Sequence, residues 1–324
     1  YAQKISFTGG GVMKRLILTA GLPNAKMTTF VEQLQRDNST IYVFDAFQER
    51  LNQYGTLDTT HTQDVMVYNR IYNLLDTAIL KNEDGVFVLL DNNLTRSRRR
   101  GLYNRYKKPK YGVAQVTTHF FVQSYSEVIN DENGLSPKSV KAQYISFQPP
   151  RVGVDADEEV VHSDIFNKIN RDNVVASRSA DELFTQLLAT PLADEIKLDY
   201  QEHDNPHHLE TIKEHIDMTI KAASTNELRQ VAMFHDLGKG ITKSVDEITG
   251  IAHMIGHPSV GAMIALAFYG EPNNITETVL WHMEAHKGIS AKVMKREKLD
   301  QPFMELQQEF AVIDSESRID TTIN

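Results

Sequence analysis

Histidine side chains are concentrated in one part of the chain. Nine of the twelve histidines lie between His203 and His286, and one of them, His235, is followed directly by Asp236. Imidazole is the commonest metal ligand among side chains that titrate near neutral pH. An imidazole and a carboxylate at the end of one apolar helix, with further histidines before and after them, form the pattern in which several helices hold one metal ion.

Helical periodicity around these residues predicts the elements that would position them. Residues 226–234 are apolar at helical spacing, and Gly238 ends this helix just beyond the His-Asp pair. His208 and His215 lie seven residues apart in a predicted helix of about 206–223, so they share one face of it. The predicted helices therefore direct imidazoles toward a common space.

The downstream residues extend this pattern. His257 opens a predicted helix of small residues, and His282 and His286 lie four residues apart on a further helix. Asp314 places a single carboxylate on an otherwise apolar helix face. Mixed imidazole and carboxylate ligands suit Mn, Fe, Co, Ni or Zn and suit Mg less well. The alternative interpretation is that these histidines are core or surface residues with ordinary hydrogen bonds.

The order of these motifs resembles the HD superfamily of metal-dependent phosphohydrolases over residues 204–318. The motifs are His208-Leu with His215, His235-Asp236-Leu-Gly-Lys239, His257-Pro-Ser-Val-Gly-Ala262, a late histidine, and Asp314-Ser-Glu-Ser-Arg318. The resemblance implies metal ligands at His215, His235, Asp236 and Asp314. It also implies that His257 and His282 bind a second metal or meet the substrate phosphate, and that Asp236 and Lys239 serve catalysis, with Lys239 contacting the phosphate.

Composition restricts the class of protein. At 324 residues, two domains are expected, and an apolar fraction of 41% is sufficient for ordinary cores. The net charge of −9 creates no global basic field for nucleic acid, although a local basic patch is compatible with it. The chain has no cysteine, which excludes thiolate sites and favours a reducing, cytoplasmic location. No stretch is long and apolar enough to cross a bilayer, so no membrane partner is expected.

The amino-terminal half alternates between strand and helix signals. Apolar runs predict strands at 14–20, 40–44, 85–91 and 113–122, and the segments between them predict helices at 27–36, 63–80 and 95–107. Strands separated by helices favour a parallel sheet covered on both faces. We therefore expect an α/β P-loop kinase-like domain at 13–165, a boundary segment at 166–195 and an all-α HD domain at 196–324, with 1–12 as a tag remnant.

The first predicted strand runs into a turn and a helix, which is the setting of a phosphate-binding loop. The ordinary loop has a glycine, four residues and then Gly-Lys-Ser/Thr. Counted from Gly21, the sixth and seventh residues are Lys26 and Met27 instead of glycine and lysine, while Thr28 stands where magnesium would bind. The bare motif therefore fails, unless Lys26, one position early, replaces the missing lysine.

The surrounding sequence resembles the polynucleotide-kinase-like P-loop kinases of phage RNA repair. Segments 13–23, 89–99 and 147–155 carry this resemblance, which covers residues 13–155. It implies nucleotide contacts at Gly21, Lys26, Thr28, Thr29 and Asp91, a general base for a 5′-hydroxyl at Asp45, and ATP with Mg²⁺ as cofactors. Gln48 replaces an arginine of the family, and 130–134 lacks its lid arginines. Since phosphoryl transfer depends on such charges, these departures argue against efficient kinase activity.

Together the patterns predict a metal-dependent phosphohydrolase acting on phosphorylated RNA ends, joined to a degenerate kinase-like domain. The alternatives are a phosphodiesterase for small cyclic or signalling nucleotides, and a non-catalytic RNA- or nucleotide-binding module with a structural metal. The basic run 96–110 is interpreted either as a phosphate-backbone track, with Tyr103, Tyr106 and Tyr111 stacking on bases, or as a solvated helix face. The metal identity and the oligomeric state stay open.

Overall fold

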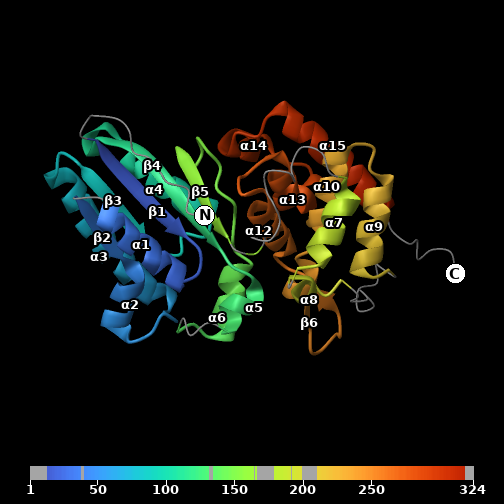
Figure 1. Cartoon of the computed structure of the whole chain (residues 1–324), viewed down its shortest axis with the longest axis horizontal. Coiled ribbons are helices and arrows are strands. Elements are labelled where there is room, and N and C mark those ends of the chain that lie inside the picture. Colours follow the sequence, from blue (N-terminus) through green and yellow to red (C-terminus); the bar gives the residue numbers. More distant parts are fainter. Residues whose placement is uncertain are drawn as a thin grey trace.

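The structure is a computed structural model that describes residues 13–37, 40–130, 134–163, 165, 179–190, 192–198 and 210–317. It confirms the expected fold class, because a five-stranded parallel α/β part precedes a largely helical part (Figure 1). The expectation of a tag remnant at 1–12 falls outside the described residues.

One parallel sheet forms the centre of the first part. Its strand order is β2-β3-β1-β4-β5, and every neighbouring pair is parallel. The strands are β1 (Lys14–Ala20), β2 (Ile41–Asp45), β3 (Gly85–Leu90), β4 (Val113–Val122) and β5 (Glu158–Ser163). Because the carboxyl ends of parallel strands meet at one edge, the residues that follow β1, β2 and β3 are brought together there.

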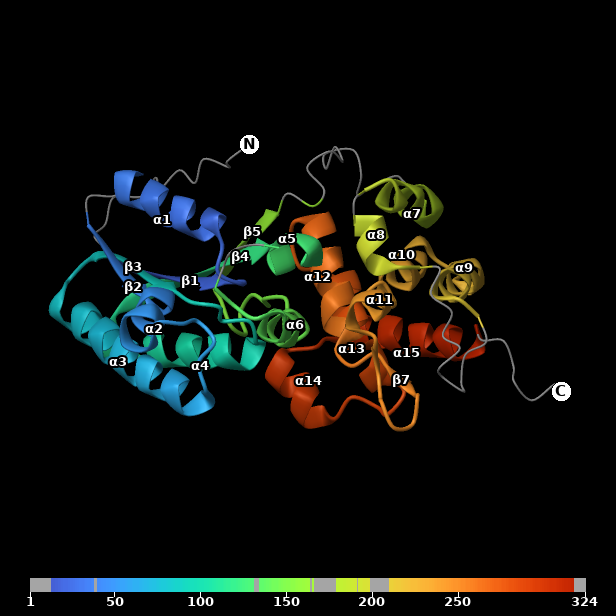
Figure 2. The same cartoon turned by 90° about the horizontal axis from the view of Figure 1, so that it is seen from below.

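Alternation along the strands determines which helix covers which face of the sheet. Leu16 and Leu18 of β1 pack in one core with α3 (His61–Lys81), whereas Ile17 packs in another with α1 (Ala25–Asp37). Successive strand side chains point to opposite faces, so an unbroken apolar strand serves both cores. Figure 2 shows α1 on one side of the sheet and α3 on the other.

The remaining elements of the first part connect and extend this sheet. They are α2 (Ala46–Tyr54), α4 (Arg96–Tyr106), a 3₁₀ turn at Pro109–Tyr111, α5 (Tyr125–Asn130) and α6 (Pro137–Tyr144). Strand β5 lies at the sheet edge in a polar, acidic stretch that the sequence pattern does not identify as a strand. Its side chains are half-exposed along most of its length. The segment therefore lacks the apolar run from which a buried strand is predicted.

The second part is a helical assembly around α12. Its helices are α7 (Ala180–Leu188), α8 (Leu192–Ile196), α9 (Ile212–Ala222), α10 (Asn226–His235), α11 (Lys239–Thr242), α12 (His257–Tyr269), α13 (Asn274–Ala285), α14 (Ala291–Glu297) and α15 (Gln301–Glu316). Two short antiparallel strands, β6 (Ser244–Val245) and β7 (Ala252–His253), form a hairpin in this part. The sequence analysis expected a domain of helices alone, so this hairpin is a small departure from that prediction. Helix α12 is apolar around nearly its whole circumference because other elements surround it. No helix among the described residues has the length and apolar character needed to cross a membrane.

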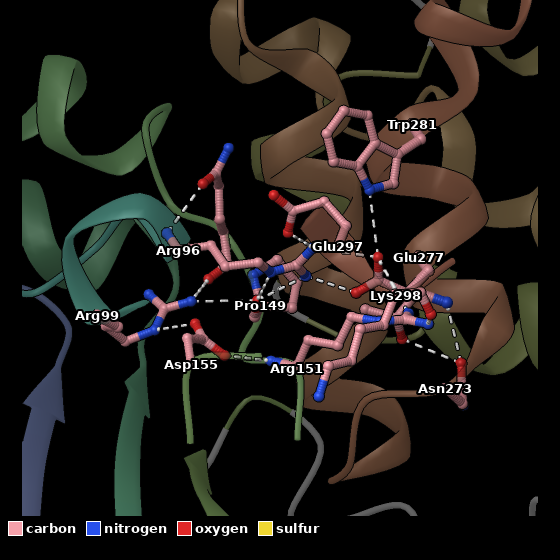
Figure 3. A network of polar contacts seen from close by, with 12 residues as sticks. Arg96, Arg99, Pro149, Arg151, Asp155, Asn273, Glu277, Trp281, Glu297 and Lys298 are labelled. Carbon is pink, nitrogen blue, oxygen red and sulfur yellow. Dashed lines mark hydrogen bonds and ion pairs between the residues drawn. The ribbon is translucent and has the colours of Figure 1, made fainter. Parts of the chain in front are cut away.

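The two parts share one apolar core and one buried ionic network. Phe120 and Phe147 of the first part belong to the same cluster as Leu183 and Phe234 of the second. Beside this cluster, Arg96 of α4 lies almost completely buried and bonds to Glu277 of α13 at 2.5 Å (Figure 3). The interface is therefore a continuous interior and not a thin contact between separate bodies.

Two arginines of α4, Arg96 and Arg99, lie inside the molecule. Arg96 also pairs with Glu297 at 3.3 Å and donates to the Pro149 carbonyl oxygen, while Arg99 pairs with Asp155 at 2.8 Å and is fully buried. Neither sequence interpretation of the basic run is correct for these two residues, since they form neither a phosphate track nor a solvated face. Their acidic partners come from distant parts of the chain, which a local charge pattern cannot reveal.

Replacing Arg96 with methionine is expected to destabilise the protein by about 1–3 kcal/mol, because Glu277 and Glu297 would lose the buried cation that they share. Glu277 would keep Arg151, and Glu297 would keep Arg100 and Arg296, which are all less buried than Arg96. The measurement is denaturant-induced unfolding. The matched control is Arg70→Met, since Arg70 is 63% exposed in its pair with Glu49 and such pairs contribute about 0–1 kcal/mol. Equal effects of the two substitutions would contradict the interpretation of the buried network.

Candidate functional site

Six side chains from five helices meet in the interior of the helical part. His215 comes from α9, His235 ends α10, Asp236 caps that helix, His257 begins α12, His282 lies in α13 and Asp314 lies in α15. All six are buried. The six residues that the sequence pattern proposes as metal ligands thus lie together in the structure.

A close backbone approach brings the start of α12 to the end of α10. A Cβ atom at Gly238 would lie 2.3 Å from the carbonyl oxygen of His257, so no larger residue fits there without movement of the backbone. Glycine after the His-Asp pair therefore does more than end the helix. It lets α12 begin directly beside Asp236, which places the His257 imidazole in the site.

The first group of ligand atoms surrounds one carboxylate oxygen of Asp236. His235 Nε2 lies 3.1 Å and His215 Nε2 3.5 Å from Asp236 Oδ2. Asp314 Oδ1 lies 3.0 Å from His215 Nε2 and 3.6 Å from His235 Nε2. One ligand atom from each of His215, His235 and Asp236 lies within 4.8 Å of the others, which is close enough for one cation.

The second group uses the other oxygen of the same carboxylate. His257 Nε2 lies 3.5 Å and His282 Nε2 3.9 Å from Asp236 Oδ1. These three residues also offer ligand atoms within 4.8 Å of one another. Asp236 is therefore common to two adjacent triads, so its two carboxylate oxygens could serve two neighbouring cation sites.

Main-chain carbonyl oxygens orient all four imidazoles. The Nδ1 atoms of His235, His257 and His282 lie 2.7 Å from the carbonyl oxygens of the residues three positions earlier, and His215 Nδ1 lies 2.9 Å from that of Ser317. A carbonyl oxygen only accepts, so each Nδ1 donates its proton there. The four Nε2 atoms are consequently directed into the site, as in metal centres whose ligands are held by second contacts.

The pair His257 and His282 fits a cation between them. Burial lowers the pKa of His257 to about 4 and that of His282 to about 3, so both are neutral at pH 7. With Nδ1 protonated, each neutral ring carries a lone pair on Nε2, and these two atoms are 3.1 Å apart. Two lone pairs at this distance repel each other, and a positive ion between or beside them removes the repulsion. The donor set could therefore hold a metal ion.

Charge pairing raises the pKa of His235, in contrast to the lowered pKa values of His257 and His282. Burial alone would lower its pKa, but the carboxylates of Asp236 and Asp314 raise it to about 10. Burial would likewise raise the pKa of Asp236, and the nearby cationic groups His235 and Lys239 instead lower it well below its ordinary value. These side chains thus form a buried ion-pair cluster in which the protonated His235 imidazole balances the carboxylates.

Two further residues complete the surroundings. Lys239 Nζ lies 2.8 Å from Asp236 Oδ2, and this side chain is buried beside the triads. His286 Nε2 lies 3.0 Å from Asp314 Oδ2, a contact that sequence analysis did not assign to the site. The spacing of four residues between His282 and His286 could have placed His286 on the same helix face, near the site. His253 is exposed, and His203, His207 and His208 fall outside the described residues.

The candidate phosphate loop lies at the carboxyl edge of the sheet, as expected. Gly21 has a φ of +149°, and a Cβ there would lie 2.6 Å from the Phe121 carbonyl oxygen, so the chain needs glycine at this turn. Met27, in the place of the usual lysine, is buried in the core beneath α1. Thr28 and Thr29 are exposed in the first turns of α1, and Lys26 is half-buried.

The acidic residues of this edge have partners within the protein. Asp45 caps α2 by accepting from the Gln48 backbone N–H at 2.8 Å, and burial raises the pKa of its carboxyl. Asp91 is fully buried and pairs with Arg50 at 3.1 Å and with Arg98. Both Asp91 oxygens are thus engaged by guanidinium groups where a kinase would need them near magnesium.

The free space beside this loop is small. A cavity of about 60 Å³ lies between the loop, α2 and α6, with Pro23, Arg50, Asn92 and Gln143 among its walls. This volume corresponds to a few water molecules at most, since one water occupies about 30 Å³ in the liquid. Residues 131–133 of the expected lid fall outside the described part of the chain.

Comparison with known proteins identifies no family. No protein-family model matches the chain, and no curated protein matches it. Among solved structures, a chain in "Structure of Pnkp1/Rnl/Hen1 complex" is similar with 17% identity and a TM-score of 0.33, over 39% of this chain and 41% of that chain. "Crystal Structure of Fungal RNA Kinase" is similar with 14% identity and a TM-score of 0.31, over 55% of this chain and 97% of that chain. Neither likeness supports a functional argument at these scores.

Binding of a divalent metal is expected to release a proton and to tighten as pH rises from about 6 to 8. Because the His235 pKa is about 10, its imidazole must lose a proton to become a ligand, and affinity should rise about tenfold per pH unit below that value. The raised pKa of His235 also affects the stability of the fold without metal. The ion pair of His235 stabilises the fold fully below pH 6.5, and this stabilisation is lost as pH rises through about 10.

Isothermal titration calorimetry with Mn²⁺ in buffers of different ionisation enthalpy measures the released protons. His257 and His282 should contribute none above pH 6, since both are already neutral there. His253→Ala serves as the control, because His253 is exposed on β7. An affinity that does not change with pH would contradict the assignment of the proton to His235.

Proposed function

We propose that the helical part is a metal-dependent phosphohydrolase of the HD type and that phosphorylated RNA ends are its substrate class. The observation that carries the proposal is the pair of buried His/Asp triads that share Asp236. The ligands proposed are His215, His235, Asp236 and Asp314 for one cation, and Asp236, His257 and His282 for a second. The donor set favours Mn, Fe, Co, Ni or Zn.

The residues of the chain supply positioning and charge. A divalent metal held by these residues would supply Lewis-acid chemistry, which lowers the pKa of water and polarises a phosphoryl oxygen. Asp236 directs one oxygen to each triad, and its position is supported by the Lys239 ammonium group at 2.8 Å. Lys239 is also the cation that would contact a non-bridging phosphoryl oxygen as negative charge develops there. His286 supports Asp314 from outside the ligand set.

The choice of RNA ends comes from the resemblance of residues 13–155 to RNA-repair kinases. The substrates proposed are a 2′,3′-cyclic phosphate or a 2′-phosphate on broken RNA. Small cyclic or signalling nucleotides are the alternative substrates for the same centre, and a structural metal in a binding module is the non-catalytic alternative.

Purified protein is expected to hydrolyse RNA 2′,3′-cyclic phosphate ends only when a transition metal is added. The Asp236→Asn substitution is expected to lower the rate of hydrolysis by about a thousandfold or more, because it removes a central electrostatic group. Metal content should fall to background in the same variant. The experiment pairs a panel of RNA ends and small cyclic nucleotides with elemental analysis, and His253→Ala is the control. Unchanged metal content in Asp236→Asn would refute the centre. If the protein hydrolyses small cyclic nucleotides and no RNA end, the alternative substrates replace RNA ends as the substrate class.

We further propose that the amino-terminal domain binds an anion or a nucleotide without efficient phosphoryl transfer. The burial of Met27 and the engagement of Asp91 by Arg50 and Arg98 favour this function over an active kinase. Backbone N–H groups at the start of α1 and its positive dipole end suit a phosphate.

ATP-dependent phosphorylation of 5′-hydroxyl RNA is expected to be undetectable in conditions where the metal-dependent hydrolysis proceeds. Radiolabelled ATP and a 5′-hydroxyl oligomer provide the assay, and equilibrium binding of ATP tests the retained anion site. Robust turnover would contradict the proposal and would make Lys26→Ala the next substitution to examine.

A further inference from the structure

Two polar side chains of the sheet face the junction between the α/β part and the helical part. Thr118 of β4 and Glu159 of β5 are direct neighbours in the register of these parallel strands, so their side chains lie on the same face of the sheet. Two residues further along each strand, Phe120 belongs to the apolar core that the two parts share, and Val161 packs against this core. Because alternate strand residues share a face, Thr118 and Glu159 are directed toward the helical part.

This pair brings two buried oxygen atoms into the junction. Thr118 is completely buried, and Glu159 is half-buried with its Oε2 atom shielded from solvent. Within the described part of the chain, neither Thr118 Oγ1 nor Glu159 Oε2 has a hydrogen-bond partner. An ionised carboxylate is costly to bury without a donor or a cation, whereas a protonated carboxyl group costs much less. The surroundings therefore favour the protonated form of Glu159.

The charged groups that act on Glu159 are acidic. Asp155 precedes β5, Glu158 is the first residue of this strand, and Glu271 lies just beyond the end of α12. Burial, together with these three carboxylates, raises the pKa of Glu159 to about 7. The side chain is thus surrounded by charges of the sign that its own ionisation would add.

The neighbouring elements carry few charges that could offset these carboxylates. Helix α12 contacts β5 and has no aspartate, glutamate, lysine or arginine in its sequence. The titratable side chain of β4 is His119, which is next to Thr118 in the strand and therefore points to the opposite face of the sheet. The Arg99 guanidinium group is engaged by Asp155 at 2.8 Å. Neutrality of Glu159 at this position thus depends on its proton.

We propose that Glu159 makes the contact between the two parts of the chain sensitive to pH. In its neutral form, the side chain is compatible with the junction between β5 and α12. In its ionised form, it is repelled by Glu271 and the other nearby carboxylates, and opening of the junction lets it reach water. Helix α12 begins at the candidate ligand His257, so one helix connects this junction with the candidate metal centre.

The raised pKa determines the pH range of the effect. Between the ordinary value of 4.5 and about 7, the folded protein holds a proton on Glu159 that the unfolded chain has lost. This proton stabilises the fold fully below pH 4.5, and the stabilisation is lost as pH rises through about 7. The junction is therefore weakest above that pH, where Glu159 is ionised in the folded protein.

The Glu159→Gln substitution tests the proposal, because the amide has nearly the same shape and does not ionise. Denaturant-induced unfolding of the natural chain and the variant is compared from about pH 5 to about pH 8, with EDTA present so that the candidate metal centre does not contribute. The ratio of the two unfolding equilibrium constants should change in favour of the variant by at least about tenfold between pH 5 and pH 7, and should level off near pH 8. Glu158→Gln is the matched control and should show no such change, since Glu158 is exposed and lies next to Glu159 on the opposite face of β5.

Two further measurements separate this role from a general effect on folding. The carboxyl carbon of Glu159, followed by NMR in the folded natural chain, should titrate with a midpoint near 7. Hydrogen exchange near pH 8 should be slower in Glu159→Gln than in the natural chain within β5 and the last turn of α12, and the two proteins should exchange equally near pH 5. An NMR midpoint near the ordinary 4.5, a ratio of unfolding constants that does not depend on pH, an equal pH dependence in Glu158→Gln, or unchanged exchange at the junction would each overturn the proposal.

Discussion

The arrangement of the whole molecule depends on the burial of the Arg96 guanidinium group between the two parts of the chain. A guanidinium group does not lose its proton in proteins, so its burial requires acceptors on every side. Glu277 and Glu297 from the helical part and the Pro149 carbonyl oxygen from the α/β part provide them (Figure 3). Neither part contains this set alone, which ties the orientation of α4 to that of α13. Since His282 lies little more than one turn beyond Glu277 on α13, the same contact anchors a helix of the candidate metal centre.

Within the candidate metal centre, Asp236 joins the two triads, as Arg96 joins the two parts of the chain. Its two oxygens face different imidazole pairs, and the backbone carbonyl contacts of the histidines prevent the rings from turning away. Rigid orientation matters because imidazoles that could rotate would relieve the repulsion between neighbouring Nε2 atoms by moving apart. Here the 3.1 Å contact of His257 with His282 is maintained by the main chain, so a cation or a proton must relieve it.

Sequence patterns predicted those features whose cause is local. Strands Lys14–Ala20 and Val113–Val122 have the predicted bounds because unbroken apolar runs mark buried parallel strands. The metal-ligand candidates were found because their types and order are distinctive. The partners of Arg96 and Arg99 were not predicted, since they lie up to about two hundred positions away in the chain and no local pattern encodes the pairing. Helix α2 was also missed, because its N-cap Asp45 was assigned to catalysis alone and not to helix initiation.

The two candidate centres differ in how their charges are satisfied, and this difference supports the different functions proposed for them. At the edge of the sheet, Asp91 already has two guanidinium partners, so a magnesium ion would have to compete with Arg50 and Arg98 for it. In the helical part, the neutral His257 and His282 rings provide lone pairs, and the carboxylates of Asp236 and Asp314 face the protonated His235 imidazole and the Lys239 ammonium group. A divalent cation there would replace a proton and relieve a repulsion, whereas at Asp91 it would break ion pairs that already exist. Metal chemistry is therefore expected in the helical part, and the α/β part is expected to position a ligand.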